Sequence, residues 1–165
     1  GAQAGTGGRE VRVRRQMLRD DGRALAHQSA LMGRKGVEKR SLQLERNTAK
    51  AKAIAEWLGQ RDEVATVHDA GLETRPWYET GQKYLPRGAG AIVSFELRGG
   101  IEAGKRFVDA VELFSHLANI GDVRSLIIHP ASTTHSQLTE EEAAATGTAP
   151  GLVRLSVGIE NLADL

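Results

Sequence analysis

The sequence has no cysteine and few aromatic residues, with three Phe, two Trp and two Tyr among 165 residues. The absence of cysteine excludes disulfide bonds, thiolate catalysis and metal sites built on cysteine ligands. No apolar run is long enough to span a bilayer, and the Gly-rich, polar first residues contain no apolar core of a signal peptide. We therefore expect a cytoplasmic protein that does not work in a membrane.

An excess of charge of one sign is also missing. Lys and Arg number 22 against 21 Asp and Glu, a formal net charge of +1, which gives no electrostatic argument for binding nucleic acid. The first fifty positions are rich in Arg and Lys, but acidic residues are interleaved there and no aromatic residue is available for base stacking. We interpret this block as a solvated helix face rather than a nucleic-acid-binding arm.

What the sequence does contain is the composition of an ordinary globular domain, with 40% hydrophobic and 26% charged residues. The strongest helix signal covers residues 41–58, where Ser41 can cap the start and Gly59 can end the helix. Before it, Gly22, Gly33 and Gly36 interrupt a polar helical pattern. The apolar face of the strong helix repeats every three or four residues and comprises Leu44, Thr48, Ala51, Ala55 and Leu58.

Alternating and β-branched segments farther along predict strands separated by helices. The predicted strands are 63–69, 91–97, 125–132 and 151–158, and the predicted helices are 77–85, 101–114 and a segment at 138–147 with capping-box spacing. A last helix opens at Asn161 and has only five residues, so we expect it to be truncated. The order predicts an α/β (α+β) fold, in which helices pack on a small mixed or antiparallel sheet.

Three histidines near Asp122 raise the question of a metal site. His116, His129 and His135 are separated by thirteen and six residues, which matches neither the i, i+4 spacing of a helix nor the alternation of a strand. We favour histidines engaged in local hydrogen bonds and predict no metal. The sequence also lacks the sharp G-x-S-x-G turn of a serine hydrolase and a Gly-rich loop between a strand and a helix for phosphate.

Arg154 is the most informative single residue. It alternates with Val153 and Leu155 on the predicted strand 151–158, so it lies on the polar face of that strand. A mid-strand arginine is either a surface residue or a planar fork for a carboxylate. The spacing alone favours the surface interpretation, and the polar loop nearby keeps the second one open.

Two long segments carry a resemblance to a known family. They read FVDAVELFSHLANIGDVRSLIIHPASTTHSQLTEEE at 107–142 and PGLVRLSVGIENLADL at 150–165, and GLETRPWYETGQKYLPRGAGAIVSFELRGG at 71–100 fits the same pattern. They closely resemble the C-terminal domain of the Cys/Met-metabolism enzymes that use pyridoxal phosphate (PLP), which is part of a fold-type I transferase. The similarity runs from about Arg9 to Leu165 and is weaker between Ala26 and Asn47, where polar and basic residues replace apolar ones.

The resemblance implies an organisation and a site. Residues 1–8 are Gly-rich and polar, and we expect them to form a flexible leader. The resemblance implies helices of an interdomain type at 9–60 and a substrate-binding α/β domain at 61–165. In this reading Arg154 holds the α-carboxylate of an amino-acid substrate, and Asn119 and Ile120 contact the same carboxylate region. Three hydroxyl residues, Ser125, Thr133 and Thr134, shape the loop around it.

The resemblance also shows what this chain does not contain. Family members attach PLP as a Schiff base to a lysine of a large domain, and no lysine here stands in such a segment. We therefore expect the chain alone to be inactive and to need a PLP-binding large domain or a full-length relative, as a homo- or hetero-oligomer. The implied activity is that of an O-acetylhomoserine sulfhydrylase-like transferase in transsulfuration and methionine biosynthesis. The alternative is a non-catalytic remnant or interaction module that docks on a full-length relative.

Overall fold

The computed structural model describes residues 8, 11, 26–137 and 139–165. The predicted leader at 1–8 and the polar helical stretch before residue 26 therefore lie outside the described residues, apart from Gly8 and Val11. The chain divides into two compact units, Gly1–Arg40 and Ser41–Leu165, which we describe separately.

Helix α2 (His27–Leu58) corrects the prediction of a helix that begins at Ser41. Its first part continues without a break through Gly33 and Gly36, so these glycines do not interrupt it and Ser41 is not its cap. A glycine inside an exposed helix costs only about 1 kcal/mol relative to alanine, which good helix formers on either side can offset. Within the unit Gly1–Arg40 the residues from His27 on are exposed, and Arg34 Nε pairs with Glu38 Oε1 at 3.0 Å.

The part of α2 that belongs to Ser41–Leu165 packs against the core. Its buried residues are Asn47, Ala51, Ile54, Ala55 and Leu58, which confirms most of the predicted apolar face. Leu44 is an exception, because 49% of its surface remains exposed. The helix ends at Leu58, as the glycine at position 59 predicts.

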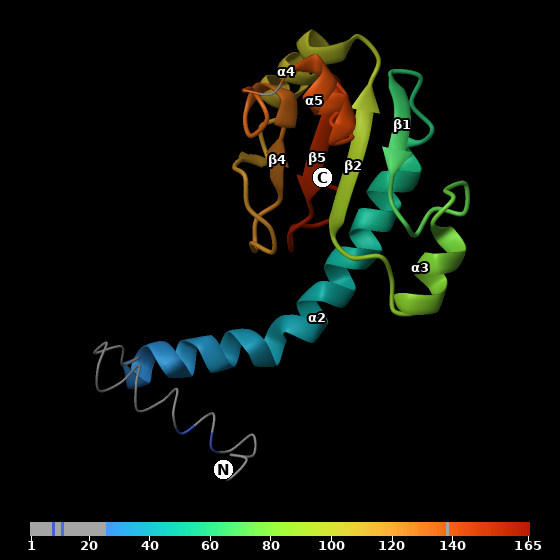
Figure 1. Cartoon of the computed structure of the whole chain (residues 1–165). Helices are drawn as coiled ribbons and strands as arrows, with labels where there is room; N and C mark the ends of the chain where they lie inside the picture. The colour runs from blue at the N-terminus through green and yellow to red at the C-terminus, as the bar shows by residue number, and fades with distance from the viewer. Residues whose placement is uncertain (1–7, 9–10, 12–25, 138) are drawn as a thin grey trace, which may run out of the picture. The chain divides into compact units, whose positions relative to one another are not determined.

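The described residues of this unit form a five-stranded mixed sheet in the order β1-β2-β5-β4-β3. Figure 1 shows β1, β2, β5 and β4 in this order. Its strands are β1 (Val64–His68), β2 (Ile92–Leu97), β3 (Ser115–His116), β4 (Leu126–Ile128) and β5 (Leu152–Ser156). The pairs β1–β2, β2–β5 and β4–β5 are antiparallel, and β3–β4 is parallel. The sheet confirms the predicted fold class, and the two-residue strand β3 is an addition to it.

Register separates the sheet into an apolar face and a second face that carries the polar residues of β2 and β5, which we call the polar face. Val93 pairs with Leu155 and Phe95 with Val153, and all four of these side chains are buried on one face. On the other face Arg154 lies between Ser94 of β2 and Ile128 of β4. The alternation predicted for these two strands is therefore confirmed.

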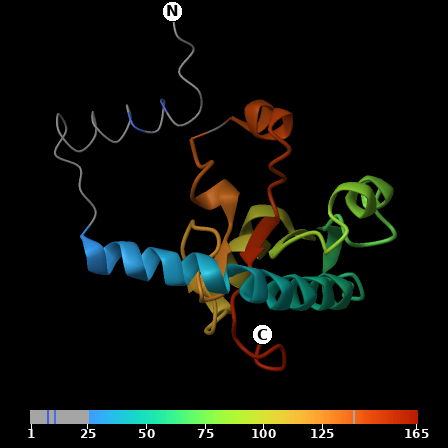
Figure 2. The ribbon, with the colours of Figure 1, turned by 90° about the horizontal axis from the view of Figure 1, so that it is seen from below.

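Helices and turns connect the strands (Figures 1 and 2). They are α3 (Tyr78–Tyr84), α4 (Gly100–Ala110), the 3-10 turn η2 (Pro130–Ser132) and α5 (Glu140–Ala145). The capping box that opens α5 is present, since Glu142 N donates to Thr139 Oγ1 at 3.3 Å and Thr139 N donates to Glu142 Oε2 at 2.9 Å. At the end of the chain, where a helix was predicted, the structure has a turn closed by a 3.1 Å hydrogen bond from Asp164 N to Asn161 O.

The core lies between α2, α4 and the apolar face of the sheet. Phe95 and Phe107 meet there edge to face, with ring centroids 5.6 Å apart and planes at 87°. Among the described helices, none has a stretch of sufficient length and apolarity to cross a bilayer.

Candidate functional site

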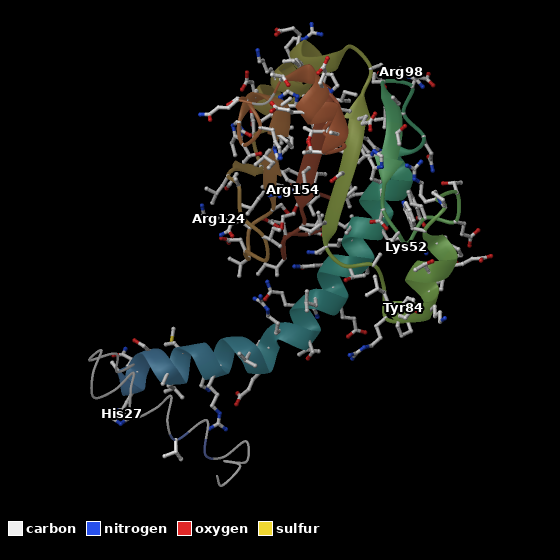
Figure 3. The ribbon with its side chains drawn as sticks, viewed as in Figure 1. His27, Lys52, Tyr84, Arg98, Arg124 and Arg154 are labelled. Atoms are coloured by element: carbon white, nitrogen blue, oxygen red, sulfur yellow. The ribbon has the colours of Figure 1, made fainter. Side chains whose placement is uncertain are left out.

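Arg154 occupies the centre of the polar face of the sheet (Figure 3). Its side chain is half-buried, and its one hydrogen bond among the described residues runs from Nη2 to Asn119 O at a long 3.4 Å. No carboxylate in the described part of the chain pairs with it. A guanidinium has five N–H donors, so most of this group remains available for a planar anion.

The loop after β3 brings its backbone to this arginine. Asn119 Oδ1 accepts a 2.8 Å hydrogen bond from Ile120 N, and Gly121 N donates to Ser156 Oγ at 3.4 Å. Arg154 and Ser156 therefore hold successive parts of the loop from neighbouring positions of the same strand face. The structure thus places Asn119 against Arg154 and Ile120 next to Asn119, with the Ile120 side chain 60% exposed.

Ser125 is fully buried and supports the loop from its other end. Its backbone N donates to Glu160 Oε1 at 2.6 Å and its Oγ donates to Glu160 Oε2 at 2.8 Å, while Gly158 N donates to the same Oγ at 2.8 Å. The serine hydroxyl therefore has both a donor and an acceptor partner inside the protein. Its position shapes the loop and is not open to a ligand.

Lys50 of α2 contacts the same region from the helix side. Its Nζ donates to Gly158 O and to Glu160 O, the latter at 2.8 Å. Burial lowers the pKa of Lys50, partly offset by the Glu160 carboxylate and reinforced by Arg46. Glu160 and Lys50 were missed by sequence reasoning, because no local pattern pairs residues that lie 110 positions apart.

The histidine–threonine segment after β4 is internally hydrogen bonded. The fully buried His129 has Nε2 2.8 Å from Pro150 O and Nδ1 2.8 Å from Ser132 Oγ. Since a carbonyl only accepts, Nε2 carries the proton, and both ring nitrogens have a hydrogen-bond partner. Thr133 Oγ1 donates to His129 O at 2.9 Å, and Thr134 Oγ1 lies 2.8 Å from His135 Nδ1.

Through these contacts Thr133 and Thr134 are bonded within their own segment after β4. Neither hydroxyl reaches Arg154 in the described structure. Nor do the described residues gather three His, Cys, Asp or Glu side chains in a group that could hold a metal ion.

Exposed apolar side chains lie in and beside the loop 117–125 between β3 and β4, which we call the Asn119 loop. Leu117, Ile120, Val123 and Ile159 each leave half or more of their surface exposed, at 50%, 60%, 54% and 56%. A cluster of this kind beside a polar site is typical of a surface that meets another protein part.

The residues present do not fit a PLP site. All six lysines lie in the described part of the chain, and five of them, Lys35, Lys39, Lys52, Lys83 and Lys105, are exposed. The sixth, Lys50, donates to two backbone carbonyls. A lysine that forms a Schiff base needs a free amine in a desolvated pocket, so no lysine here is placed for that role.

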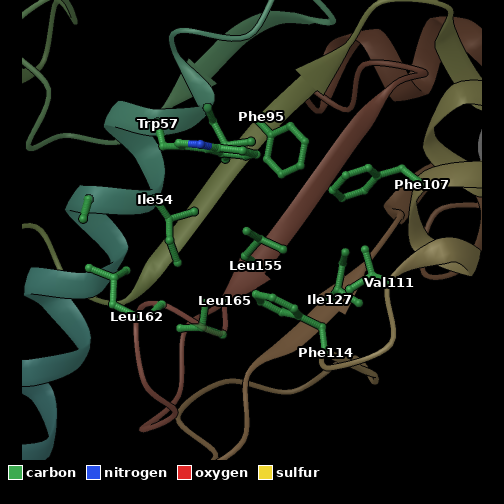
Figure 4. Close-up of a pocket in the computed structure, with 13 residues that line it drawn as sticks. Ile54, Trp57, Phe95, Phe107, Val111, Phe114, Ile127, Leu155, Leu162 and Leu165 are labelled. Carbon is green, nitrogen blue, oxygen red and sulfur yellow. The ribbon is translucent and has the colours of Figure 1, made fainter.

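An apolar cavity of about 590 Å³ opens on the other side of the sheet (Figure 4). Trp57 and Ile54 of α2, Phe107 of α4 and Phe95 and Leu155 of the sheet line it, together with Leu162 and Leu165. Arg154 points from the opposite face of β5, so the cavity is separate from the site at Arg154.

The sequence matches the family model described as Cys/Met metabolism PLP-dependent enzyme over residues 4–165. It is 49% identical over 156 residues to an O-acetyl-L-homoserine sulfhydrylase of Leptospira meyeri, covering 94% of this chain and 35% of the relative. It is 47% identical over 155 residues to O-acetyl-L-homoserine sulfhydrylase 1 of Thermus thermophilus, covering 94% of this chain and 37% of the relative. The chain therefore spans little more than a third of the length of these curated relatives.

Solved structures show the same similarity. A crystal structure from Campylobacter jejuni, of a candidate O-acetylhomoserine (thiol)-lyase with a pyridoxyl-lysine phosphate, aligns with a TM-score of 0.81 at 37% identity, covering 93% of this chain and 37% of that one. Cystathionine gamma synthase of Xanthomonas oryzae pv. oryzae, in complex with aminoacrylate and cysteine, aligns with a TM-score of 0.69 at 41% identity, covering 79% and 33%.

Proposed function

Since the chain belongs to the family of Cys/Met metabolism PLP-dependent enzymes, we propose that it is the part of such an enzyme that binds the substrate carboxylate. In this proposal Arg154 pairs with the α-carboxylate of an amino acid, and the loop at Asn119 and Ile120 borders the same group. The observation that carries the proposal is a half-buried arginine with one long hydrogen bond and no carboxylate partner in the described residues. A partly desolvated charge of this kind gains much from a planar anion.

The proposed reaction class is γ-replacement, as in the O-acetyl-L-homoserine sulfhydrylases to which the chain is similar. A sulfur nucleophile would take the place of acetate on the amino-acid side chain, a step of methionine biosynthesis. Arg154 would orient the amino acid, and a cofactor-bearing part, attached or separate, would supply PLP and its lysine. We place this chain at the C-terminal side of the complete enzyme and expect it to work in the cytoplasm.

The exposed apolar cluster at Leu117, Ile120, Val123 and Ile159 supports docking of that cofactor-bearing part at the carboxylate site. Docking there would desolvate Arg154 and strengthen its pairing with the substrate. The partner in this proposal is a PLP-binding large domain or a full-length relative, in a homo- or hetero-oligomer.

A chimera tests the proposal. The matching 155 residues of the Thermus enzyme are replaced by this chain, and kcat/KM is measured with O-acetyl-L-homoserine and sulfide. We expect turnover, and we expect Arg154→Lys to lower kcat/KM about 10- to 100-fold, because lysine cannot form the two parallel hydrogen bonds of the guanidinium. An active chimera that is indifferent to Arg154→Lys would contradict the role of this arginine.

A second measurement tests where the cofactor lysine lies. The 165-residue chain is mixed with PLP, reduced with borohydride and analysed by mass spectrometry of its peptides. We expect no stoichiometric adduct on one lysine, since five lysines are exposed and Lys50 is engaged. A single, complete adduct would mean that this chain has a cofactor site of its own.

The alternative function is a non-catalytic module that docks on a full-length relative. It is favoured by the short coverage of the relatives and by the lysines that do not fit a Schiff base. An inactive chimera whose PLP-binding part remains folded and keeps the visible absorbance of bound PLP would favour this alternative.

A further inference from the structure

The Asn119 loop is held at its two ends by contacts of different strength. At the far end from the site, the Glu160 carboxylate accepts from Ser125 N at 2.6 Å and from Ser125 Oγ at 2.8 Å, and Ile159 N donates to Val123 O at 2.9 Å. At the site itself the two contacts are 3.4 Å long, from Gly121 N to Ser156 Oγ and from Arg154 Nη2 to Asn119 O. Hydrogen bonds of that length are weak, so they do not by themselves fix the loop.

The end of the loop that Glu160 holds through Ser125 depends on Lys50. Its ammonium donates to the carbonyls of Gly158 and Glu160, and thereby holds the backbone from which the Glu160 side chain turns back to Ser125. Hydrogen bonds with an ionised partner are roughly twice as strong as neutral ones. A continuous path therefore runs from α2 through Lys50 and Glu160 to the loop that borders the arginine.

The backbone at Gly158 is packed closely against the loop and leaves no room for a side chain. A Cβ atom at Gly158 would lie 2.4 Å from Val123 O, 2.5 Å from Arg124 C and 2.6 Å from Glu160 Oε2. Gly158, which follows β5, therefore lies directly against the backbone of Val123 and Arg124 in the loop. A shift of either segment would move the other.

We propose that Lys50 and Glu160 are positioning residues, which set the place of the Asn119–Gly121 segment relative to the Arg154 guanidinium and so tune the recognition of a carboxylate. We call this pair the Lys50–Glu160 clamp. The inference rests on the proposed function only in naming a carboxylate as the ligand. The pKa of Glu160 supports it, because burial opposes ionisation and yet the hydrogen bonds from Ser125 and the charge of Lys50 hold that pKa below its ordinary value.

Hydrogen exchange of the 165-residue chain, followed by NMR, tests the clamp. In Lys50→Met and in Glu160→Gln we expect the amides of Gly121, Ser125 and Ile159 to exchange about tenfold faster or more. The amides of Val93 and Phe95 in β2 should keep their protection. Lys50→Arg should restore most of the protection at the loop, because arginine also donates to two carbonyls.

Matched controls come from exposed ion pairs. Lys52→Met removes the neighbouring lysine, which lies 3.9 Å from Glu56, and Glu102→Gln removes the partner of Lys105. Neither should change exchange in the loop. Unchanged loop exchange in both clamp variants, or an equal loss of protection in loop and sheet, would overturn the positioning role.

The ligand is tested with O-acetyl-L-homoserine, added at millimolar concentration while the Nε–H signal of Arg154 is followed. We expect a saturable shift that Lys50→Met and Glu160→Gln weaken about threefold to tenfold in Kd and that Lys52→Met leaves unchanged. If Arg154 responds equally in all variants, the clamp proposal fails and the proposed function stands. If Arg154 does not respond even in the parent chain, the proposed carboxylate role fails, and the exchange comparison still decides whether the clamp holds the loop.

Discussion

The two faces of the central sheet place their side chains in different environments. On one face Val93, Phe95, Val153 and Leu155 are nearly inaccessible to solvent and pack under α2 and α4. On the other face Arg154 is half-buried and has a single long hydrogen bond within the described residues. Neighbouring residues of one strand thus lie in opposite environments, and the period of two residues keeps these environments apart. Substitutions on the two faces should therefore affect different observables.

The largest effect is expected on the apolar face. Phe95→Ala removes a fully buried ring that meets Phe107 edge to face, and should lower the free energy of unfolding by about 3–5 kcal/mol. Urea denaturation followed by circular dichroism measures it. Tyr84→Ala, at a side chain that is 69% exposed, is the control and should cost far less. Equal losses at the two positions would mean that the packing described for Phe95 is wrong.

A smaller loss is expected where the strand exit meets the loop. Gly158→Ala forces a Cβ against Val123 O and Arg124 C and should cost about 1–3 kcal/mol in the same urea experiment. Gly36→Ala, with nothing within 4 Å of the added atom in an exposed helix, should instead stabilise by about 0.5–1 kcal/mol. The comparison fails if both changes have the same sign.

The contribution of Glu160 should depend on pH. Burial disfavours its charged form, but hydrogen bonds from Ser125 and the charge of Lys50 outweigh that cost and lower the pKa in the folded state. Its stabilisation is therefore complete above the unfolded-state pKa of about 4.3 and is lost as the pH falls through the lower folded-state value. The stability difference between the parent and Glu160→Gln, measured by thermal unfolding, should shrink in that range. A difference that stays constant on acidification contradicts this assignment.

The smallest effect on stability is expected on the polar face. Arg154→Met should change the free energy of unfolding by no more than about 0.5 kcal/mol, since one long hydrogen bond is lost and an unpaired charge is removed. The same substitution should abolish the binding of O-acetyl-L-homoserine. A loss of stability comparable to that of Phe95→Ala would show that Arg154 is a structural residue.

The sheet could be predicted because β2 and β5 carry an alternation of apolar and polar residues and because β1 and β4 are short segments rich in β-branched residues. β3 could not, since Ser115 and His116 are extended only through their parallel pairing with Leu126 and Ile127. The start of α2 was predicted wrongly because Gly33 and Gly36 look like breaks, whereas a long helix tolerates them. The turn at 162–164 shows the converse, because a helical pattern of five residues did not produce a helix.

In the candidate site, too, some residues could be predicted from the sequence and others could not. The polar face of the strand identified Arg154, and only the resemblance to the family favoured a carboxylate over a surface role. Lys50 and Glu160 could not be found from the sequence, because their contacts join α2 to the end of the chain. Ser125 was expected at the loop, but its complete burial depends on Glu160 and Gly158, which no local pattern reveals.

The apolar cavity beside α2 has a consequence for how the purified chain would behave. Aromatic and aliphatic side chains line about 590 Å³ of open space, and Trp57 on its rim remains 53% exposed. Such a surface binds environment-sensitive dyes and favours self-association as the concentration rises. In a cell it would also be a recognition signal for chaperones and proteases, so the lifetime of this polypeptide would depend on how quickly that surface is covered.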